Sequence, residues 1–267
     1  MFDKKHAAGC LAVVALITLG AVLALAQVVA PATPTPAPAA PQPGDLKAKQ
    51  LIDQMIEALG GNAYLNLNDS SQEGRSYSFH HGEPTSTGLL YWRFTRFPDK
   101  ERVELTKQRD VVYVYNGNQS WELTFKGVKP GDPKEMVDYL RHQEHSLETV
   151  LRLWLHKPGV ALLYEGTGIA EQKPAEKVTV LARNDSVTIY LDPTTHLPIK
   201  KTYVWRDPED KQKNTEEDVY DNYRPVQGVM TPFSFSRVFN GEIASQRFLN
   251  SIKYNTGMSD DVFVPKR

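Results

Sequence analysis

The apolar positions near the start of the chain follow a helical period. Between residues 45 and 59, apolar side chains recur every three or four positions, and Gly60 and Gly61 follow them. The apolar residues are Leu46, Ile52, Met55, Ile56 and Leu59. This spacing predicts an amphipathic helix that begins at Asp45 and ends at the glycine pair.

From about residue 71 the period changes to two, which is typical of β-strands with one buried face. Trp121 and Leu123 alternate with polar residues, and Asn116-Gly117 lies just before them, where it predicts a hairpin turn. A second hairpin is predicted at Asn240-Gly241. Later strands are predicted near 159–165, 176–183, 186–191, 198–206, 216–223, 229–239 and 243–254.

A second helix is predicted from about Pro133 to His156, where Pro158-Gly159 follows it. Its apolar stripe consists of Met136, Leu140, Leu147, Val150, Leu151 and Trp154. The predicted order of elements is thus one helix, four strands, one helix and about seven strands. Short loops favour antiparallel pairing, and a sheet of about ten strands curls or closes. We therefore predict a mainly β fold.

The first 26 residues have the pattern of a signal peptide. Lys4 and Lys5 precede an apolar stretch, and Ala24-Leu25-Ala26 forms a cleavage site, so the mature chain is expected to begin near Gln27. An uncleaved membrane anchor is the alternative. Cys10, the only cysteine, lies in this segment. We expect export to the periplasm.

Residues 27–44 are rich in proline and alanine, which favours an extended linker. Residues 45–267 contain no second linker and are interpreted as one domain. The chain has 31 basic and 32 acidic residues. This near balance argues against a nucleic-acid partner.

Motifs for catalysis, cofactors and metals are missing from the sequence. It has no nucleophile elbow, phosphate-binding loop or dinucleotide motif, and we expect neither an enzyme nor a cofactor. His142, Glu144 and His145 lack a zinc-ligand spacing, so we interpret them as a solvated polar face and expect no metal. An enzyme would remain possible if His80 or His81 lay beside two carboxylates in a pocket.

Large apolar side chains on the strands and the second helix are the candidate ligand site. A curled sheet with few helices can leave an apolar cavity, and these side chains are expected to line its concave face. A closed core with no room for a ligand is the alternative. The candidate residues are Leu90, Trp92, Phe94, Val103, Leu105, Trp121, Leu123, Leu151 and Trp154.

Five stretches of the sequence, in this order, resemble the LolA/LolB-like superfamily of periplasmic outer membrane lipoprotein-sorting and carrier proteins. They are GLLYWRFTRFP at 88–98, NGNQSW at 116–121, LDPTTHLP at 191–198, YRPVQGVMTP at 223–232 and DVFVP at 261–265. Together with the predicted elements they span the whole domain from residue 45 to residue 267.

The resemblance implies an incomplete, curled antiparallel β-barrel of about eleven strands, with helices covering an apolar cavity that takes acyl chains. It also implies an arginine that holds the lid helices closed. Arg96 is the nearest match, although Phe97 separates it from Pro98. Membrane-bound donor and acceptor proteins are the partners that such carriers imply.

The predicted function is non-enzymatic binding and transport of lipid or lipid-modified protein in the periplasm, toward the outer membrane. The alternative is an envelope sensor or assembly factor that binds a protein partner through strand edges or the linker.

Overall fold

The computed structural model describes residues 43–85 and 87–266. The predicted signal peptide and nearly all of the linker lie outside these ranges and stay predictions. Within the described residues, no helix is both long enough and apolar enough to span a membrane.

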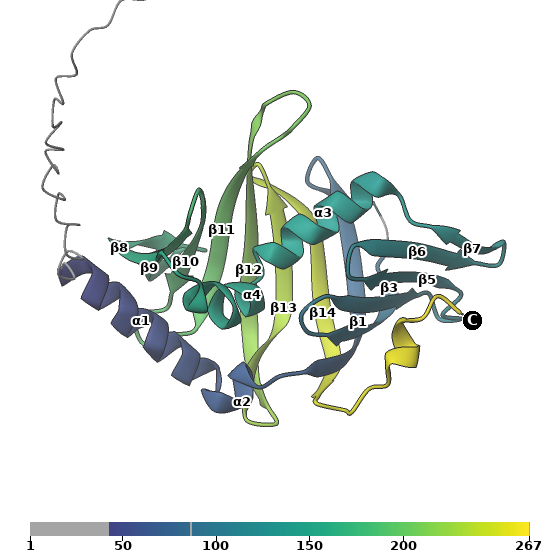
Figure 1. Ribbon diagram of the computed structural model, residues 1–267, viewed down its shortest axis with the longest axis horizontal. Coiled ribbons are helices and arrows are strands. Elements are labelled where there is room, and N and C mark those ends of the chain that lie inside the picture. Colours follow the sequence, from purple (N-terminus) through teal and green to yellow (C-terminus); the bar gives the residue numbers. More distant parts are fainter. Residues whose placement is uncertain (1–42, 86, 267) are drawn as a thin grey trace, which may run out of the picture. The chain divides into compact units, whose positions relative to one another are not determined.

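One antiparallel sheet of fourteen strands forms the body of the protein (Figure 1). The strands are β1 (Asp69–His80), β2 (Glu83–Pro84), β3 (Leu89–Arg96), β4 (Lys100–Leu105), β5 (Val111–Asn116), β6 (Gln119–Thr124), β7 (Gly127–Pro130), β8 (Val160–Ala170), β9 (Lys173–Ala182), β10 (Asp185–Leu191), β11 (Pro198–Arg206), β12 (Lys213–Val226), β13 (Val229–Phe239) and β14 (Glu242–Tyr254). The sheet is curled and stays open, as predicted. It has fourteen strands rather than about eleven, because the sequence pattern missed the long first strand β1 and the short exposed strands β2 and β7.

The order of the strands is β7-β6-β5-β4-β3-β1-β14-β13-β12-β11-β10-β9-β8, with β2 paired to β1. Two meanders therefore meet where β1 pairs with β14, and the strands β7 and β8 form the two outer edges. The chain has to travel from one edge to the other between β7 and β8. It does so through the helices α3 (Pro133–Glu144) and α4 (Leu147–Arg152) and the 3₁₀ helix η1 (Trp154–His156), which cross the concave face (Figure 1).

The second helix was predicted to be continuous, and this prediction is wrong. His145 ends α3, and Ser146 starts α4 with extended backbone dihedrals. The Ser146 hydroxyl accepts a hydrogen bond from the Thr149 backbone N–H at 3.1 Å, which is the interaction of an N-cap. A serine in mid-pattern therefore marked a new helix start. Of the predicted apolar stripe, Leu140 on α3 is 41% exposed, whereas Leu147, Val150 and Leu151 on α4 are buried.

The main core lies between α1 (Pro43–Leu59) and α4 on one side and strands β9–β11 on the other. Gly60 and Gly61 end α1 with positive φ angles of 126° and 55°, as their position in the sequence predicted. The short helix α2 (Asn62–Leu65) follows. The fully buried members of this core include Leu51, Met55, Val150, Leu151, Trp154, Val178, Val180, Val187, Ile189 and Leu191.

A second, smaller core covers the outer face of the other meander. Val112, Val114 and Leu123 are buried there, with Trp121 packed against them. The C-terminal 3₁₀ helix η2 (Asp260–Phe263) packs against β4 and β5, and its Phe263 is fully buried.

The C-terminal segment is held in place by one carboxylate at the start of β1. The Asp69 carboxylate accepts hydrogen bonds from the backbone N–H groups of Thr256, Gly257 and Met258, and from the Thr256 hydroxyl. Burial alone would raise the pKa of Asp69, but these four donors lower it below its usual range. The chain end is thereby fixed across the outer face of the sheet.

We expect Leu123→Ala to lower the free energy of unfolding by about 2–5 kcal/mol, because Leu123 is 1% exposed and its truncation leaves a cavity. Phe125→Ala, two residues further along, is the control: Phe125 is 80% exposed, so its loss should change stability by less than about 0.5 kcal/mol. Urea unfolding of both variants measures the difference, and equal losses would contradict this assignment of the second core.

Candidate functional site

A cavity of about 450 Å³ lies on the concave side of the sheet, beneath α3 and α4. Strands from both meanders contribute to its walls, namely β1, β3, β4, β12, β13 and β14. A volume of this size is typical of sites that bind small molecules. The cavity exists because the sheet curls away from the helices that connect its two edges and cover its concave face.

The lining of the cavity is chemically divided. One part is apolar or tyrosine-rich, and it includes Leu147, Tyr220, Tyr223, Val229, Leu249, Ile252 and Tyr254. The other part carries charged side chains, and it includes Arg93, Glu101, Asp218, Arg237 and Arg247. The sequence pattern did not predict this charged part, because single polar residues on strands ordinarily indicate the solvent face.

Arg93 and Glu101 form a two-pronged ion pair between β3 and β4. Arg93 donates from Nε and Nη2 to the two carboxylate oxygens, both at 2.8 Å. Burial alone would raise the pKa of Glu101, but the adjacent Arg93 charge lowers it below its usual range. Each charge of this buried pair therefore neutralises the other.

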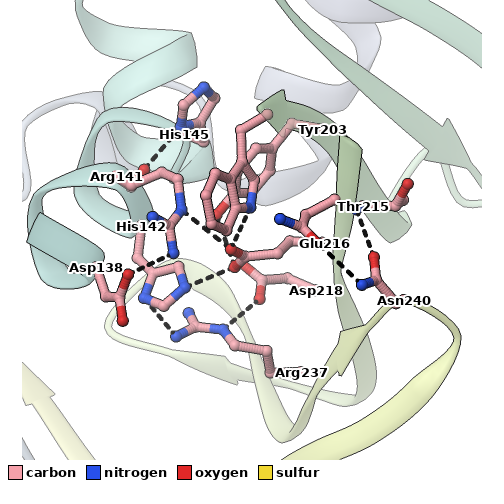
Figure 2. Close-up of polar contacts among 12 residues, drawn as sticks. Asp138, Arg141, His142, His145, Tyr203, Thr215, Glu216, Asp218, Arg237 and Asn240 are labelled. Atoms are coloured by element: carbon pink, nitrogen blue, oxygen red, sulfur yellow. Dashed lines mark hydrogen bonds and ion pairs between the residues drawn. The ribbon is translucent and has the colours of Figure 1, made fainter. Parts of the chain in front are cut away.

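Glu216 on β12 is the polar centre that ties α3 to the sheet (Figure 2). Its side chain is 4% exposed, and it accepts hydrogen bonds from four donors. They are Arg141 Nε at 3.1 Å, His142 Nε2 at 2.6 Å, Tyr203 Oη at 2.8 Å and Trp205 Nε1 at 2.8 Å. Burial opposes ionisation, but these donors and the Arg141 charge lower the pKa of Glu216 to about 2.

His142 links this centre to a second buried carboxylate. Its Nδ1 accepts from Arg237 Nη1 at 2.9 Å, so its Nε2 carries the proton donated to Glu216. Arg237 also donates to Asp218, whose other oxygen lies 2.8 Å from Lys201 Nζ. Burial lowers the pKa of His142, which favours its neutral form.

An aromatic contact holds the middle of α3 on the other meander. The Tyr139 ring stacks on Tyr115 of β5 with centroids 4.0 Å apart and planes 12° apart. Gln143 donates a hydrogen bond to the Tyr139 hydroxyl at 2.9 Å. The helix is therefore attached at both sides of the cavity, by a stacked ring at one and by buried polar contacts at the other.

The interpretation of His142 and His145 as a solvated polar face is wrong. His145 is 6% exposed and stacks on Tyr203 at 4.0 Å, while its Nε2 lies 2.9 Å from Asp185. Periodicity could not reveal this, because the face opposite the apolar stripe of α3 packs against charged strand residues. In the sequence, a polar helix face that packs on a polar sheet face has the same pattern as a helix face exposed to solvent.

The candidate strand residues, which were expected to line the concave face together, lie on two faces of the sheet. The β3–β4 register pairs Trp92 with Glu104 and Arg93 with Val103. Paired residues point to the same side of a sheet, so the prediction that these residues all line the concave face is wrong. Trp92, Phe94, Trp121 and Leu123 share the outer face, whereas Val103 and Leu105 are on the cavity side. Alternation within one strand cannot fix the register of the next.

None of the nine predicted ligand residues is among those that line the cavity. Leu90, on the same side of β3 as Trp92, is also on the outer face. Leu151 and Trp154 belong to the main core, where the Trp154 indole donates to Glu144 at 2.8 Å. A ligand role for these nine residues stays a prediction.

Arg96 lines the cavity, and its charged end binds the C-terminal segment. Its Nη1 donates to Asp260, which also accepts from Lys100 at 2.8 Å. A lid-latch role for Arg96 stays a prediction, whereas Arg141 and His142 make the polar contacts between α3 and β12.

Acid should weaken the attachment of α3. The pKa of Glu216 is about 2 in the folded protein and 4.5 when unperturbed, so its contribution is complete above pH 4.5 and is lost toward pH 2. The lowered pKa of His142 adds a further loss of stability that begins below pH 6.5. As the pH falls, His142 takes up a proton in the unfolded chain before it does so in the folded protein. We expect the free energy of unfolding to fall from pH 6.5 downward, most steeply below pH 4.5.

Glu216→Gln isolates the larger part of this effect. It should destabilise the protein by about 3–5 kcal/mol at pH 7 and remove about 3 kcal/mol of the acid dependence below pH 4.5. Glu217→Gln, one position along β12 and on the other face, should cost at most about 1 kcal/mol and keep that dependence. Urea unfolding at pH 3, 5 and 7 measures both, and an unchanged acid dependence in Glu216→Gln would contradict the role of this carboxylate.

Comparison with known proteins gives a likeness in structure alone. No family model and no curated protein matches the sequence. A DUF1329 family protein from Desulfovibrio piger ATCC 29098 aligns with a TM-score of 0.56 at 11% identity, over 81% of this chain and 97% of that one. A putative outer membrane lipoprotein-sorting protein domain from Vibrio parahaemolyticus aligns with a TM-score of 0.52 at 10% identity, over the same shares. The chain therefore has a LolA-like fold.

Proposed function

We propose that this protein is a non-enzymatic carrier that binds lipid, or the lipid of a modified protein, in its roofed cavity. The observation that carries the proposal is the 450 Å³ cavity, part apolar and tyrosine-lined, beneath helices that connect the two sheet edges. The fold likeness to a putative outer membrane lipoprotein-sorting protein domain supports it. An acyl chain buried there would gain about 0.8 kcal/mol for each methylene group.

A carrier also has to release its cargo, and the attachment of α3 suits that requirement. Glu216, Arg141 and His142 are polar, so water replaces their mutual hydrogen bonds when the helix lifts. The net cost of such an exchange is about 0.5–1.5 kcal/mol for each hydrogen bond and more for charged groups. In this proposal α3 is the lid, and its polar contacts make opening reversible.

The proposed location is the periplasm, and the proposed direction of transport is toward the outer membrane. The signal-peptide pattern of residues 1–26 supports export, and the linker of residues 27–44 would give the domain reach. Membrane-bound donor and acceptor proteins are the partners that this role requires.

Filling the cavity tests the proposal. Ser245 on β14 lines the cavity, and Ser245→Trp places a bulky ring in it. We expect this variant to lose at least about tenfold in affinity for a fluorescent fatty-acid probe, because ring and acyl chain compete for one volume. Fluorescence titration of the purified protein measures the affinity.

The matched control is Ser251→Trp, on the same strand at an exposed position. It should bind the probe like the unmodified protein. If the unmodified protein fails to bind the probe, or if both tryptophan variants bind it equally well, the cavity is not a lipid site.

A partner-binding role is the second candidate, because the sheet has open edges. All four residues of the edge strand β7 are exposed, and Phe125 beside it is 80% exposed. Such an edge can accept a strand from another protein. A stoichiometric partner that copurifies equally with the unmodified protein and with Ser245→Trp would favour this role over lipid transport.

A further inference from the structure

Arg247 is a cavity arginine without a counter-charge. It lies on β14 near the middle of the sheet, where the register pairs it with Ser76 of β1 and Phe235 of β13. Within the described residues, no carboxylate lies within ion-pair distance of its guanidinium, and it donates no hydrogen bond. Its five N–H donors are therefore left for whatever enters the cavity.

The other two arginines of the charged part are already neutralised. Arg93 binds Glu101 through both prongs, and Arg237 binds Asp218. Over the whole lining there are six lysines and arginines against four aspartates and glutamates. The lining therefore carries a net positive charge, to which Arg247 contributes at the boundary with the apolar part.

The surroundings of Arg247 make its charged form energetically unfavourable when the cavity holds no ligand. Its guanidinium lies 4.3 Å from the centroid of the Phe235 ring, a favourable but weak contact. Burial first, and the nearby Arg93 charge second, lower the pKa of Arg247 to about 10. It is therefore cationic at neutral pH and poorly solvated, which is the condition in which an anion binds most strongly.

Apolar side chains continue along the same strand from this charge. Leu249, Ile252 and Tyr254 of β14 all line the cavity, as does Arg247 itself. A strand rises about 3.3 Å per residue, so this row extends roughly 20 Å from the guanidinium. A cation at one end and an apolar wall beyond it match a molecule with an acidic head and a hydrocarbon tail.

We propose that the cavity selects anionic amphiphiles, with Arg247 binding the carboxylate or phosphate of the head and the apolar row of β14 contacting the acyl chain. This rests on the lipid-binding function proposed above. Arginine suits the task because its planar fork donates two parallel hydrogen bonds to a carboxylate or phosphate. Neutral lipids of equal chain length would leave the guanidinium unpaired.

Three ligands with the same twelve-carbon chain test the selection, namely dodecanoate, dodecyl phosphate and dodecan-1-ol. Each displaces an uncharged solvatochromic dye from the full-length protein. At least one of the two anions should bind about tenfold or more tightly than the alcohol. The anion with the larger preference identifies the head group as carboxylate or phosphate.

Arg247→Gln should reduce this preference to within about twofold, while the affinity for the alcohol stays unchanged. Its melting temperature without ligand should be equal to or higher than that of the unmodified protein, because an unpaired buried charge is removed. If Arg247 instead stabilised the fold, its replacement would lower the melting temperature. Arg247→Met, which keeps the length without the charge, serves if the glutamine variant does not fold.

Arg152→Gln is the matched control. Arg152 is the other cavity arginine for which no ion pair is found among the described residues, and its guanidinium stacks 3.7 Å from the Phe97 ring centroid. This variant should keep the preference for the anions. Loss of the preference in Arg152→Gln but not in Arg247→Gln would overturn the assignment.

Two further outcomes separate this proposal from the one on which it rests. If the alcohol and both anions bind equally well to the unmodified protein, lipid binding stands and the selection by Arg247 is wrong. If none of the three displaces the dye, both proposals fail.

Discussion

The connection between the two edges of the sheet determines the rest of this structure. Because β7 and β8 lie at opposite ends of the strand order, the chain between them has to cross one face of the sheet, and it crosses the concave one (Figure 1). Helices suit this crossing, because their backbone groups form hydrogen bonds within the helix and the face of a sheet provides no backbone partners. The crossing leaves space beneath α3, and that space is the cavity.

The two helices of the crossing are held to the rest of the protein in different ways. The apolar side chains of α4 belong to the main core, so lifting it would expose Val150 and Leu151 to water. The contacts of α3 to the sheet include a stacked tyrosine, the hydrogen bonds to Glu216 and the hydrogen bond from Arg237 to His142. The break at Ser146 lies between them.

Much of the fold could be predicted from the sequence, because local patterns determine local structure. The first helix with its glycine stop, the hairpin turns at Asn116-Gly117 and Asn240-Gly241, and the seven strands of the second meander all have a local signal. The site could not be predicted in the same way. Which face of β3 and β4 points inward depends on the register between strands, and the buried charges of Arg93 and Glu216 look like surface residues until their partners are known.

The charged part of the cavity limits which molecules the proposed function would accept. An entirely apolar cavity would accept any acyl chain, whereas in the proposal above Arg247 would restrict the head group that follows the chain inside.

The most direct test of the cavity as a lipid site is native mass spectrometry of the full-length protein, expressed in cells and purified from the envelope fraction without detergent. We expect a population whose mass exceeds that of the polypeptide by the mass of a lipid, which is released on denaturation and recovered by solvent extraction. A single population at the mass of the bare polypeptide, with no lipid in the extract, would contradict it.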